Sequence, residues 1–275
     1  MRWPESPLQA FRRLTREVRV VLDSKRLGGN DPFAGGNAWA FQPGSLDVAP
    51  SVALQVSIKG PIDPVTGYIC DIRILDRLVR DALKAWYESE TPPANWVAWS
   101  IGFHQVLASQ SDVLPANCSF ESLEIGVTSQ LSLRTGSQEP HVIELTRQFE
   151  FSASHRLHAP SLSAEVNQEL FGKCNRPHGH GHNYVLAVTI RIPSNRIDRG
   201  PDPVEVLDEE IRTHVIDRLD HFHLNLDLPE FKNLNPTVEN IVSVIRQWIH
   251  GKISVGDLAG IRLYETPKTW VDWVE

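Results

Sequence analysis

Histidines crowd into one short part of this 275-residue chain: five of the 11 lie between His155 and His182. His180 and His182 are two residues apart at the start of a predicted strand. Residues at that spacing share one face, with about 6.6 Å between their Cα atoms. Two imidazoles so placed can bind one ion at about 2.0–2.1 Å each. We therefore predict a metal site on this face.

The third ligand has to come from elsewhere, because His178 and His182 would lie about 13 Å apart in an extended strand. His155 ends the preceding predicted strand, and antiparallel pairing would bring it opposite the His180–His182 segment. Three neutral histidines leave one tetrahedral position open, as catalytic zinc sites do. The alternatives are a solvent-exposed His/Gly loop and an adventitious metal site.

Three further features have side chains suited to chemistry. Cys174 lies just before the histidines, and a thiol near a dication can act as a base or nucleophile. The pair Asp220 and His221 could hold an imidazole in one tautomer and supply a proton. Glu265 stands in a strand pattern, where a carboxylate could bind a guanidine-like ring edge with two hydrogen bonds. Each has a simpler explanation: a small buried thiol, a helix-end pair and a surface strand residue.

The elements that must position these residues occur in the same order in both halves of the chain. Each half starts with an alternating strand, TREVRVVLDSKRL at 15–27 and TRQFEFSASHRL at 146–157. Each continues with a second strand, two helices and closing strands. The predicted helices span 71–86 and 94–108 in the first half, and 207–221 and 237–249 in the second. The order ββααββ, twice, predicts an α+β fold with antiparallel sheets. Two unrelated α+β domains are the alternative.

Composition excludes several classes of function. The chain has 27 basic and 34 acidic side chains and a net charge of −7, which disfavours a nucleic-acid-binding surface. No apolar run reaches the roughly 18–20 residues that span a bilayer, and the N-terminus has no apolar signal core. Three cysteines, an odd number, argue against a disulfide framework. We therefore expect a cytoplasmic protein with no nucleic-acid or membrane partner.

Five segments together resemble the 6-pyruvoyltetrahydropterin synthase family, which includes 6-carboxytetrahydropterin synthase. They follow the family's order, at near-family spacing, and cover residues 150–275 densely: FSASHRLHAPSL (151–162), FGKCNRPHGHGHNY (171–184), LDHFHLNLDLP (219–229), NPTVEN (235–240) and YET (264–266). The resemblance implies tunnelling-fold (T-fold) domains, with two helices on one face of each antiparallel sheet. It also implies a homo-oligomer in which sheets join into a barrel and active sites lie at subunit interfaces.

The resemblance also implies roles for individual residues. Zinc would bind the three histidines at 155, 180 and 182, and Cys174 would be the catalytic base. Asp220 and His221 would complete a proton relay. The pterin's amino-pyrimidine edge would be anchored by Glu265.

The pocket would be lined by Thr237 and Glu239. The reaction implied by the resemblance is loss of triphosphate from 7,8-dihydroneopterin triphosphate. A 6-carboxytetrahydropterin synthase and a non-catalytic pterin-binding protein are the alternatives. The carboxy branch has three residues between the cysteine and the first histidine, a spacing that His178 and His180 also satisfy. Asn183 and Tyr184 favour the register with zinc on His180 and His182.

The first half keeps a family fragment but lacks the chemistry. GPIDPVTGYICDIRILDRLV (60–79) resembles the family's loop and helix after the second strand. However, Lys25 stands in place of the strand histidine, and Pro50 and Val52 in place of the paired histidines. We therefore predict a degenerate T-fold domain at 1–140, without zinc ligands, and a catalytic T-fold domain at 141–275.

Overall fold

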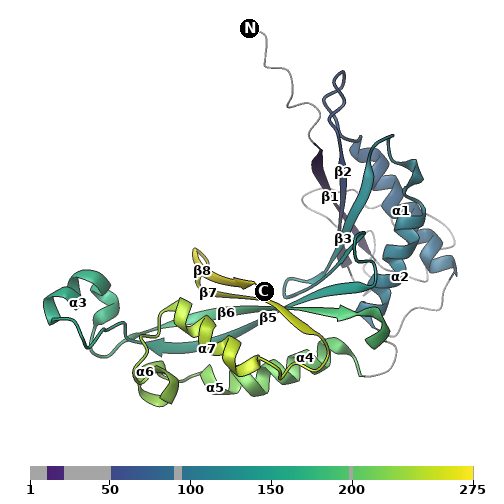
Figure 1. Cartoon of the computed structure of the whole chain (residues 1–275). Coiled ribbons are helices and arrows are strands. Elements are labelled where there is room, and N and C mark those ends of the chain that lie inside the picture. Colours follow the sequence, from purple (N-terminus) through teal and green to yellow (C-terminus); the bar gives the residue numbers. More distant parts are fainter. Residues whose placement is uncertain (1–10, 22–50, 90–94, 198–200, 275) are drawn as a thin grey trace, which may run out of the picture. The chain divides into compact units, whose positions relative to one another are not determined.

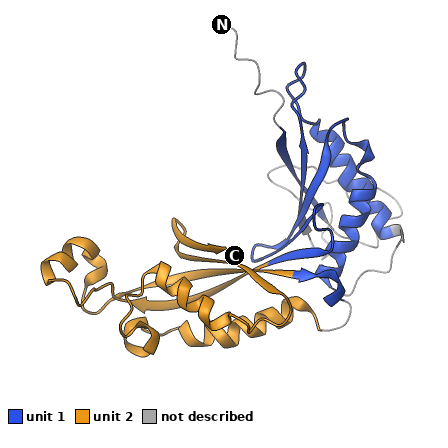
Figure 2. Cartoon of the chain, viewed as in Figure 1, with its two compact units in different colours: residues 1–145, 192–199 blue, residues 146–191, 200–275 orange. Residues whose placement is uncertain are grey.

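The computed structural model describes residues 11–21, 51–89, 95–197 and 201–274. The chain divides into two compact units (Figure 2). The first comprises Met1–Leu145 and Ile192–Arg199, and the second Thr146–Arg191 and Gly200–Glu275. The predicted positions Lys25 and Pro50 lie outside the described residues.

In the first unit, four antiparallel strands pair in chain order (Figure 1). They are β1 (Arg12–Val21), β2 (Ser51–Gly60), β3 (Ser119–Thr128) and β4 (Leu131–Gly136). The helices are α1 (Ile72–Ser89), α2 (Trp96–Ser109) and a 3-10 turn (Ser111–Val113). Leu54, Val56 and Ile58 alternate along β2 and are fully buried. They therefore mark the face of the sheet that packs into the core.

In the second unit, the strands follow the order β5-β6-β7-β8, and the pairs β6–β7 and β7–β8 are antiparallel. They are β5 (Val142–His155), β6 (His180–Pro193), β7 (Asp257–Thr266) and β8 (Thr269–Val274). The α-helices are α3 (Ala164–Phe171), α4 (Pro203–Ile211), α5 (Asp217–Leu219), α6 (Leu224–Asp227) and α7 (Val238–Ile249). Short 3-10 turns span Gly172–Asn175, Ser194–Arg196 and Pro229–Phe231, and a π-helical turn spans Arg212–Ile216.

Strand β6 carries both the core and the start of the site. Tyr184, Leu186, Val188 and Ile190 alternate along it and are fully buried. His180 and His182 have the same parity, so they lie on the core-facing side of the sheet. Helix α7 packs on β7 and β8, and its apolar residues close this core.

The α+β class with antiparallel pairing is confirmed, as are the predicted helices at 71–86, 94–108 and 237–249 to within a few residues. The helix predicted at 207–221 is corrected. It starts at Pro203, where the side chain of Asp202 accepts a hydrogen bond from Val204 N at 2.9 Å, and α4 ends at Ile211. The strand predicted at 15–27 is described only as far as Val21.

The π turn after α4 has a physical reason in the spacing of the buried residues. Leu207, Ile211, Val215 and Leu219 recur every four residues, and all are fully buried. An α-helix turns once in 3.6 residues, so this stripe would rotate away from the core. A π turn is wider and compensates for that rotation, so Val215 and Leu219 stay buried.

Helix α3 was not predicted, because its stabilising contacts are polar. Asn167 is fully buried, and its side chain pairs with both the N–H and the carbonyl of Ala159. Val166 and Leu170 of α3 are exposed, so the helix has no apolar stripe against the core. No helix in the described ranges has the length and apolar character needed to cross a membrane.

Candidate metal centre and active site

Three histidines meet where β5 ends and β6 begins. His155 is the last residue of β5, and His180 and His182 are the first and third residues of β6. One ring nitrogen from each lies within 4.8 Å of those of the other two. The Nε2 atoms of His155 and His180 are 3.2 Å apart. The structure therefore brings together the three residues predicted as ligands.

The His155 ring is held in one orientation by backbone. Its Nδ1 lies 2.7 Å from the carbonyl oxygen of Pro236. Since a carbonyl only accepts, Nδ1 carries the hydrogen and Nε2 is left with its lone pair. Such a contact fixes the tautomer of a metal-binding histidine. The ring is fully buried.

Buried nitrogen atoms without a protein partner mark the same place. Among the described residues, His182 Nε2 and His180 Nδ1 are buried and have no hydrogen-bond partner. An unpaired buried polar atom costs about 1–3 kcal/mol, and a cation held by His182 Nε2 would remove that cost at this atom. The donor set of three imidazoles suits a borderline-soft divalent ion such as zinc.

Burial also keeps these rings in the state that binds metal. It lowers the pKa of His155 to about 4 and lowers the pKa of His180 as well. Neutral imidazole is the form that donates a lone pair to a metal. Both rings are therefore ready to bind an ion at neutral pH.

The metal-free protein is expected to lose stability as the pH falls from about 6.5 to about 4. His155 has a folded pKa of about 4 against 6.5 for an unperturbed histidine. Between these values the unfolded chain binds a proton that the folded chain does not, so the stability present above pH 6.5 is lost on acidification. The loss should reach about 3 kcal/mol.

Urea unfolding of metal-free protein at pH 7 and pH 4.5 measures this loss. The variant His155→Leu should show a flatter dependence on pH over the same interval. Equal slopes for the variant and the wild type would contradict the assignment to His155.

Glycines allow the β6 start to approach β5. Gly179 has a φ of +70°, and a Cβ there would lie 2.6 Å from the carbonyl oxygen of His155. At Gly181 a Cβ would lie 3.4 Å from the carbonyl oxygen of Ala153. Any other residue at Gly179 would push His180 away from His155.

Glu265 of β7 reaches the histidine cluster. Its Oε1 lies 3.5 Å from His155 Nε2 and 3.7 Å from His182 Nε2. The side chain is 20% exposed. A carboxylate predicted to bind a pterin edge therefore lies beside the candidate metal ligands.

Cys174 lies in the 3-10 turn after α3, and backbone contacts hold it near the end of β5. Its carbonyl accepts a hydrogen bond from Leu157 N at 2.9 Å. The next residue, Asn175, is buried, and its Oδ1 contacts His158 Nδ1 at 2.9 Å and Arg156 at 3.1 Å. The turn that carries the thiol is thus fixed to the three residues that follow His155.

Asp220 and His221 form a pair beside the C-terminal part of β5, where His221 N donates a hydrogen bond to the carbonyl of Ser152. Asp220 accepts a hydrogen bond from Ser152 N at 2.8 Å, which is the main cause of its lowered pKa. Its other oxygen lies 2.8 Å from His221 Nδ1. His221 has a φ of +65°, and its side chain is 82% exposed.

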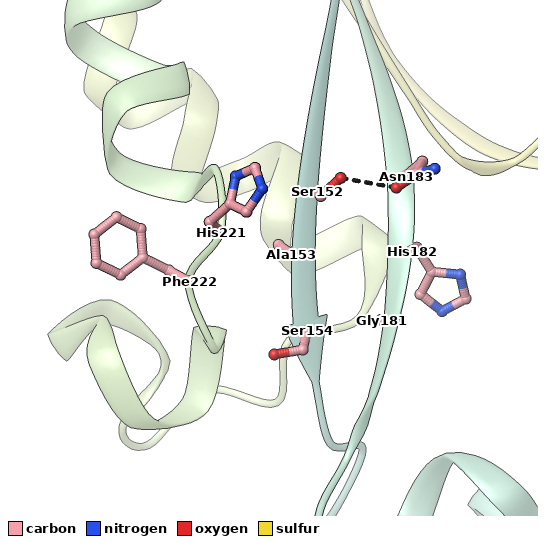
Figure 3. A pocket seen from close by; sticks show the side chains of 8 residues that line it. All are labelled: Ser152, Ala153, Ser154, Gly181, His182, Asn183, His221 and Phe222. Atoms are coloured by element: carbon pink, nitrogen blue, oxygen red, sulfur yellow. Dashed lines mark hydrogen bonds between the residues drawn. The ribbon is translucent and has the colours of Figure 1, made fainter.

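An open pocket lies beside this pair, with His221 and Phe222 next to β5 (Figure 3). Among the residues that line it, Ser152 Oγ donates a hydrogen bond to Asn183 Oδ1 at 2.8 Å. The side chain of His182 projects from β6 on the side away from His221 (Figure 3). No hydrogen bond or ion pair within the described ranges joins Asp220 or His221 to Cys174 or to the three histidines.

Thr237 and Glu239 lie at the start of α7. Thr237 caps the helix by accepting a hydrogen bond from Asn240 N at 3.4 Å. Glu239 is an exposed residue of the first turn. The preceding residue is Pro236, so this helix start also supplies the carbonyl that orients His155.

A sequence model of the family described as 6-pyruvoyl tetrahydropterin synthase matches residues 144–275. A Drosophila melanogaster protein named 6-pyruvoyl tetrahydrobiopterin synthase is 41% identical over 138 residues, which cover 50% of this chain and 82% of the fly protein. This chain belongs to the 6-pyruvoyl tetrahydropterin synthase family. A Homo sapiens protein of the same name as the fly protein is 38% identical over 126 residues, covering 45% of this chain and 85% of the human protein.

A solved structure, that of Caenorhabditis elegans 6-pyruvoyl tetrahydropterin synthase, aligns with a TM-score of 0.45 and 34% identity. The alignment covers 49% of this chain and 96% of the worm chain. The family predicted from the motifs is thus confirmed, on sequence similarity to the second half. The match begins at residue 144, so the degenerate copy in the first half stays a prediction.

Asparagines also shape this family site, and sequence reasoning missed them. The Asn225 side chain pairs with both the N–H and the carbonyl of Arg156. Asn235 accepts a hydrogen bond from His158 N at 3.1 Å. Both lie inside segments that carry the family resemblance, at 219–229 and 235–240, but a single asparagine has no distinctive spacing.

Proposed function

We propose that this chain is a zinc-dependent lyase of the 6-pyruvoyltetrahydropterin synthase type, acting on 7,8-dihydroneopterin triphosphate with loss of triphosphate. The convergence of His155, His180 and His182 carries the proposal. It is supported by the 41% identity, over 138 residues, to a relative named 6-pyruvoyl tetrahydrobiopterin synthase. We propose zinc because three histidines with one open position are a ligand set of catalytic zinc sites.

The three histidines would hold the metal, which when bound would polarise the substrate's side-chain oxygens and acidify the neighbouring C–H bond. Cys174 would take the proton from that carbon, since a thiolate is a competent base. Its turn is fixed through Leu157 and Asn175, so the sulfur would meet the substrate at a defined position.

Asp220 and His221 would return the proton. Asp220 holds His221 through Nδ1, which leaves Nε2 to donate or accept a proton. The His221 ring is exposed and lies across β5 from His182. It would therefore serve a site completed by a neighbouring copy of the chain, in a homo-oligomer built from joined sheets.

Glu265 would anchor the amino-pyrimidine edge of the pterin, because two carboxylate oxygens match two N–H groups side by side. Its placement beside the metal ligands would put the ring next to the bound ion. Thr237 and Glu239 would line the pocket from the start of α7.

One assay tests the reaction. Purified full-length protein, loaded with zinc, is incubated with 7,8-dihydroneopterin triphosphate, and the pterin product is identified by its mass. We expect release of triphosphate and a product with the mass of 6-pyruvoyltetrahydropterin. A product with a carboxyl group at carbon 6 would assign the chain to the other branch. No turnover with metal bound would overturn the proposal.

We further propose that residues 1–140 are a degenerate T-fold copy that contributes a wall of the assembly. Val52, on β2 at the position of a paired histidine, is an apolar core residue. A fragment of residues 141–275 is expected to differ from the full chain in its assembly by light scattering and to lose activity. Full activity and an unchanged number of subunits in the fragment would rule out this role.

A further inference from the structure

The backbone directly after His155 is held by asparagine side chains from two later segments. Arg156 N donates to Asn225 Oδ1 at 2.7 Å, and Asn225 Nδ2 donates back to the Arg156 carbonyl at 3.0 Å. His158 N donates to Asn235 Oδ1 at 3.1 Å. Asn225 lies in α6, and Asn235 lies just before α7. Arg156 and His158 are thus both attached to the α6–α7 part of the second unit.

The two residues that alternate with these bond to α3 and to the turn that carries the thiol. Leu157 N donates to the Cys174 carbonyl at 2.9 Å. Ala159 N donates to Asn167 Oδ1 at 2.8 Å, and Asn167 Nδ2 donates to the Ala159 carbonyl at 2.9 Å. The partners therefore alternate from residue to residue, as those of an extended chain between two neighbouring strands do.

Asparagine side chains here replace neighbouring strands. An asparagine amide has the same carbonyl and N–H groups as a peptide unit, and Asn225 and Asn167 each use both groups on a single residue. We call residues 156–159, with these side chains and Asn235, the asparagine bracket. The bracket begins at His155 and binds the turn of Cys174, so it joins a candidate metal ligand to the candidate base.

We propose that Asn225 and Asn235 are positioning residues, which fix the Cys174 thiol relative to His155 through the asparagine bracket. The inference rests on the proposed function, in which His155 holds the metal and Cys174 takes a proton from the substrate. A displacement of about 1 Å between reacting groups can lower a rate about 100-fold. Loss of a bracket bond should therefore lower kcat, and should leave KM unchanged because the residues proposed to bind the pterin ring are not altered.

The first test measures release of triphosphate by full-length, zinc-loaded protein. Asn225→Ala should lower kcat at least about 10-fold, while KM and zinc content change less than about twofold. Combined with Cys174→Ala, the same change should alter the residual kcat less than about threefold, because no thiol is left to position. The matched control is Asn233→Ala, which removes an exposed asparagine two residues before Asn235 and should behave as the wild type does.

Aspartate variants separate the hydrogen bonds from the bulk of the side chains. Asn235→Asp keeps an oxygen that accepts from His158 N, so its kcat should stay within about threefold of the wild type, whereas Asn235→Ala should lose at least about 10-fold. Asn225→Asp cannot donate to the Arg156 carbonyl and should lose as much as Asn225→Ala. Wild-type kcat in Asn225→Ala, or an equal effect of that change with and without the thiol, would overturn the proposal.

A second readout does not depend on turnover. Iodoacetamide should modify the half-buried Cys174 at least about fivefold faster in Asn225→Ala than in the wild type, because its turn opens more often. Peptide mass spectrometry follows the reaction, with Cys118 of the first unit as the internal standard. An unchanged rate would overturn the bracket. A raised rate in a protein whose wild type releases no triphosphate would keep the bracket and remove the proposed function.

Discussion

His180→Ala is expected to empty the metal site, whereas His178→Ala is expected to leave it full. The ligand nitrogens of His155, His180 and His182 lie within 4.8 Å of one another, and His178 is an exposed residue outside this cluster. Loss of one of three imidazoles leaves two, too few to hold zinc against solvent. Loss of a residue that only hydrogen-bonds to a metal ligand already lowers the affinity for the metal by about 10- to 100-fold. Loss of a ligand itself should therefore lower the affinity for zinc further.

Zinc content after dialysis, and zinc affinity in competition with a chelator, measure this effect. His178→Ala is the matched control, because it removes the same side chain two residues away. Loss of zinc from His178→Ala as well as from His180→Ala would contradict this assignment and would select the register in which His178 and His180 are the ligands.

Parity made the histidine cluster predictable from sequence. His180 and His182 share a face because they are two residues apart on a strand, and His155 ends the strand that precedes it. The alternation of apolar residues along β2 and β6 made the sheets predictable in the same way. In these cases the spacing of residues in the chain fixes their positions in space.

Contacts between distant segments could not be predicted in this way. The carbonyl of Pro236 that orients His155, and the Asn225 side chain that pairs with Arg156, act across about 70–80 residues of sequence with no periodic pattern. Glu265 was assigned to the pterin edge, and its approach to the histidines depends on the register between β6 and β7, in which Tyr264 pairs with Val185. Registers follow from packing of whole sheets and not from a local motif.

Cys174→Ala is expected to abolish turnover while the protein keeps its metal. If the thiolate removes the proton from the substrate carbon, its loss should lower kcat by about 10²- to 10⁴-fold, the usual contribution of a positioned base. Zinc content should not change, because the sulfur is not among the clustered ligand atoms of the described residues. Steady-state release of triphosphate and zinc content, measured on the same sample, separate the two effects.

Cys118→Ala is the matched control, since it removes a free thiol from the first unit and should leave kcat unchanged.

A second variant, Asn175→Ala, separates the chemistry of the Cys174 thiol from its placement. Asn175 contacts Arg156 and His158 and does not itself take a proton. Its loss should therefore lower kcat less than loss of the thiol and should leave the dependence of kcat on pH unchanged.

Turnover by Cys174→Ala within about threefold of the wild type, with metal bound, would show that the base lies elsewhere. His221 would then be the next candidate, because its ring nitrogen is exposed and its partner Asp220 already holds it in one tautomer.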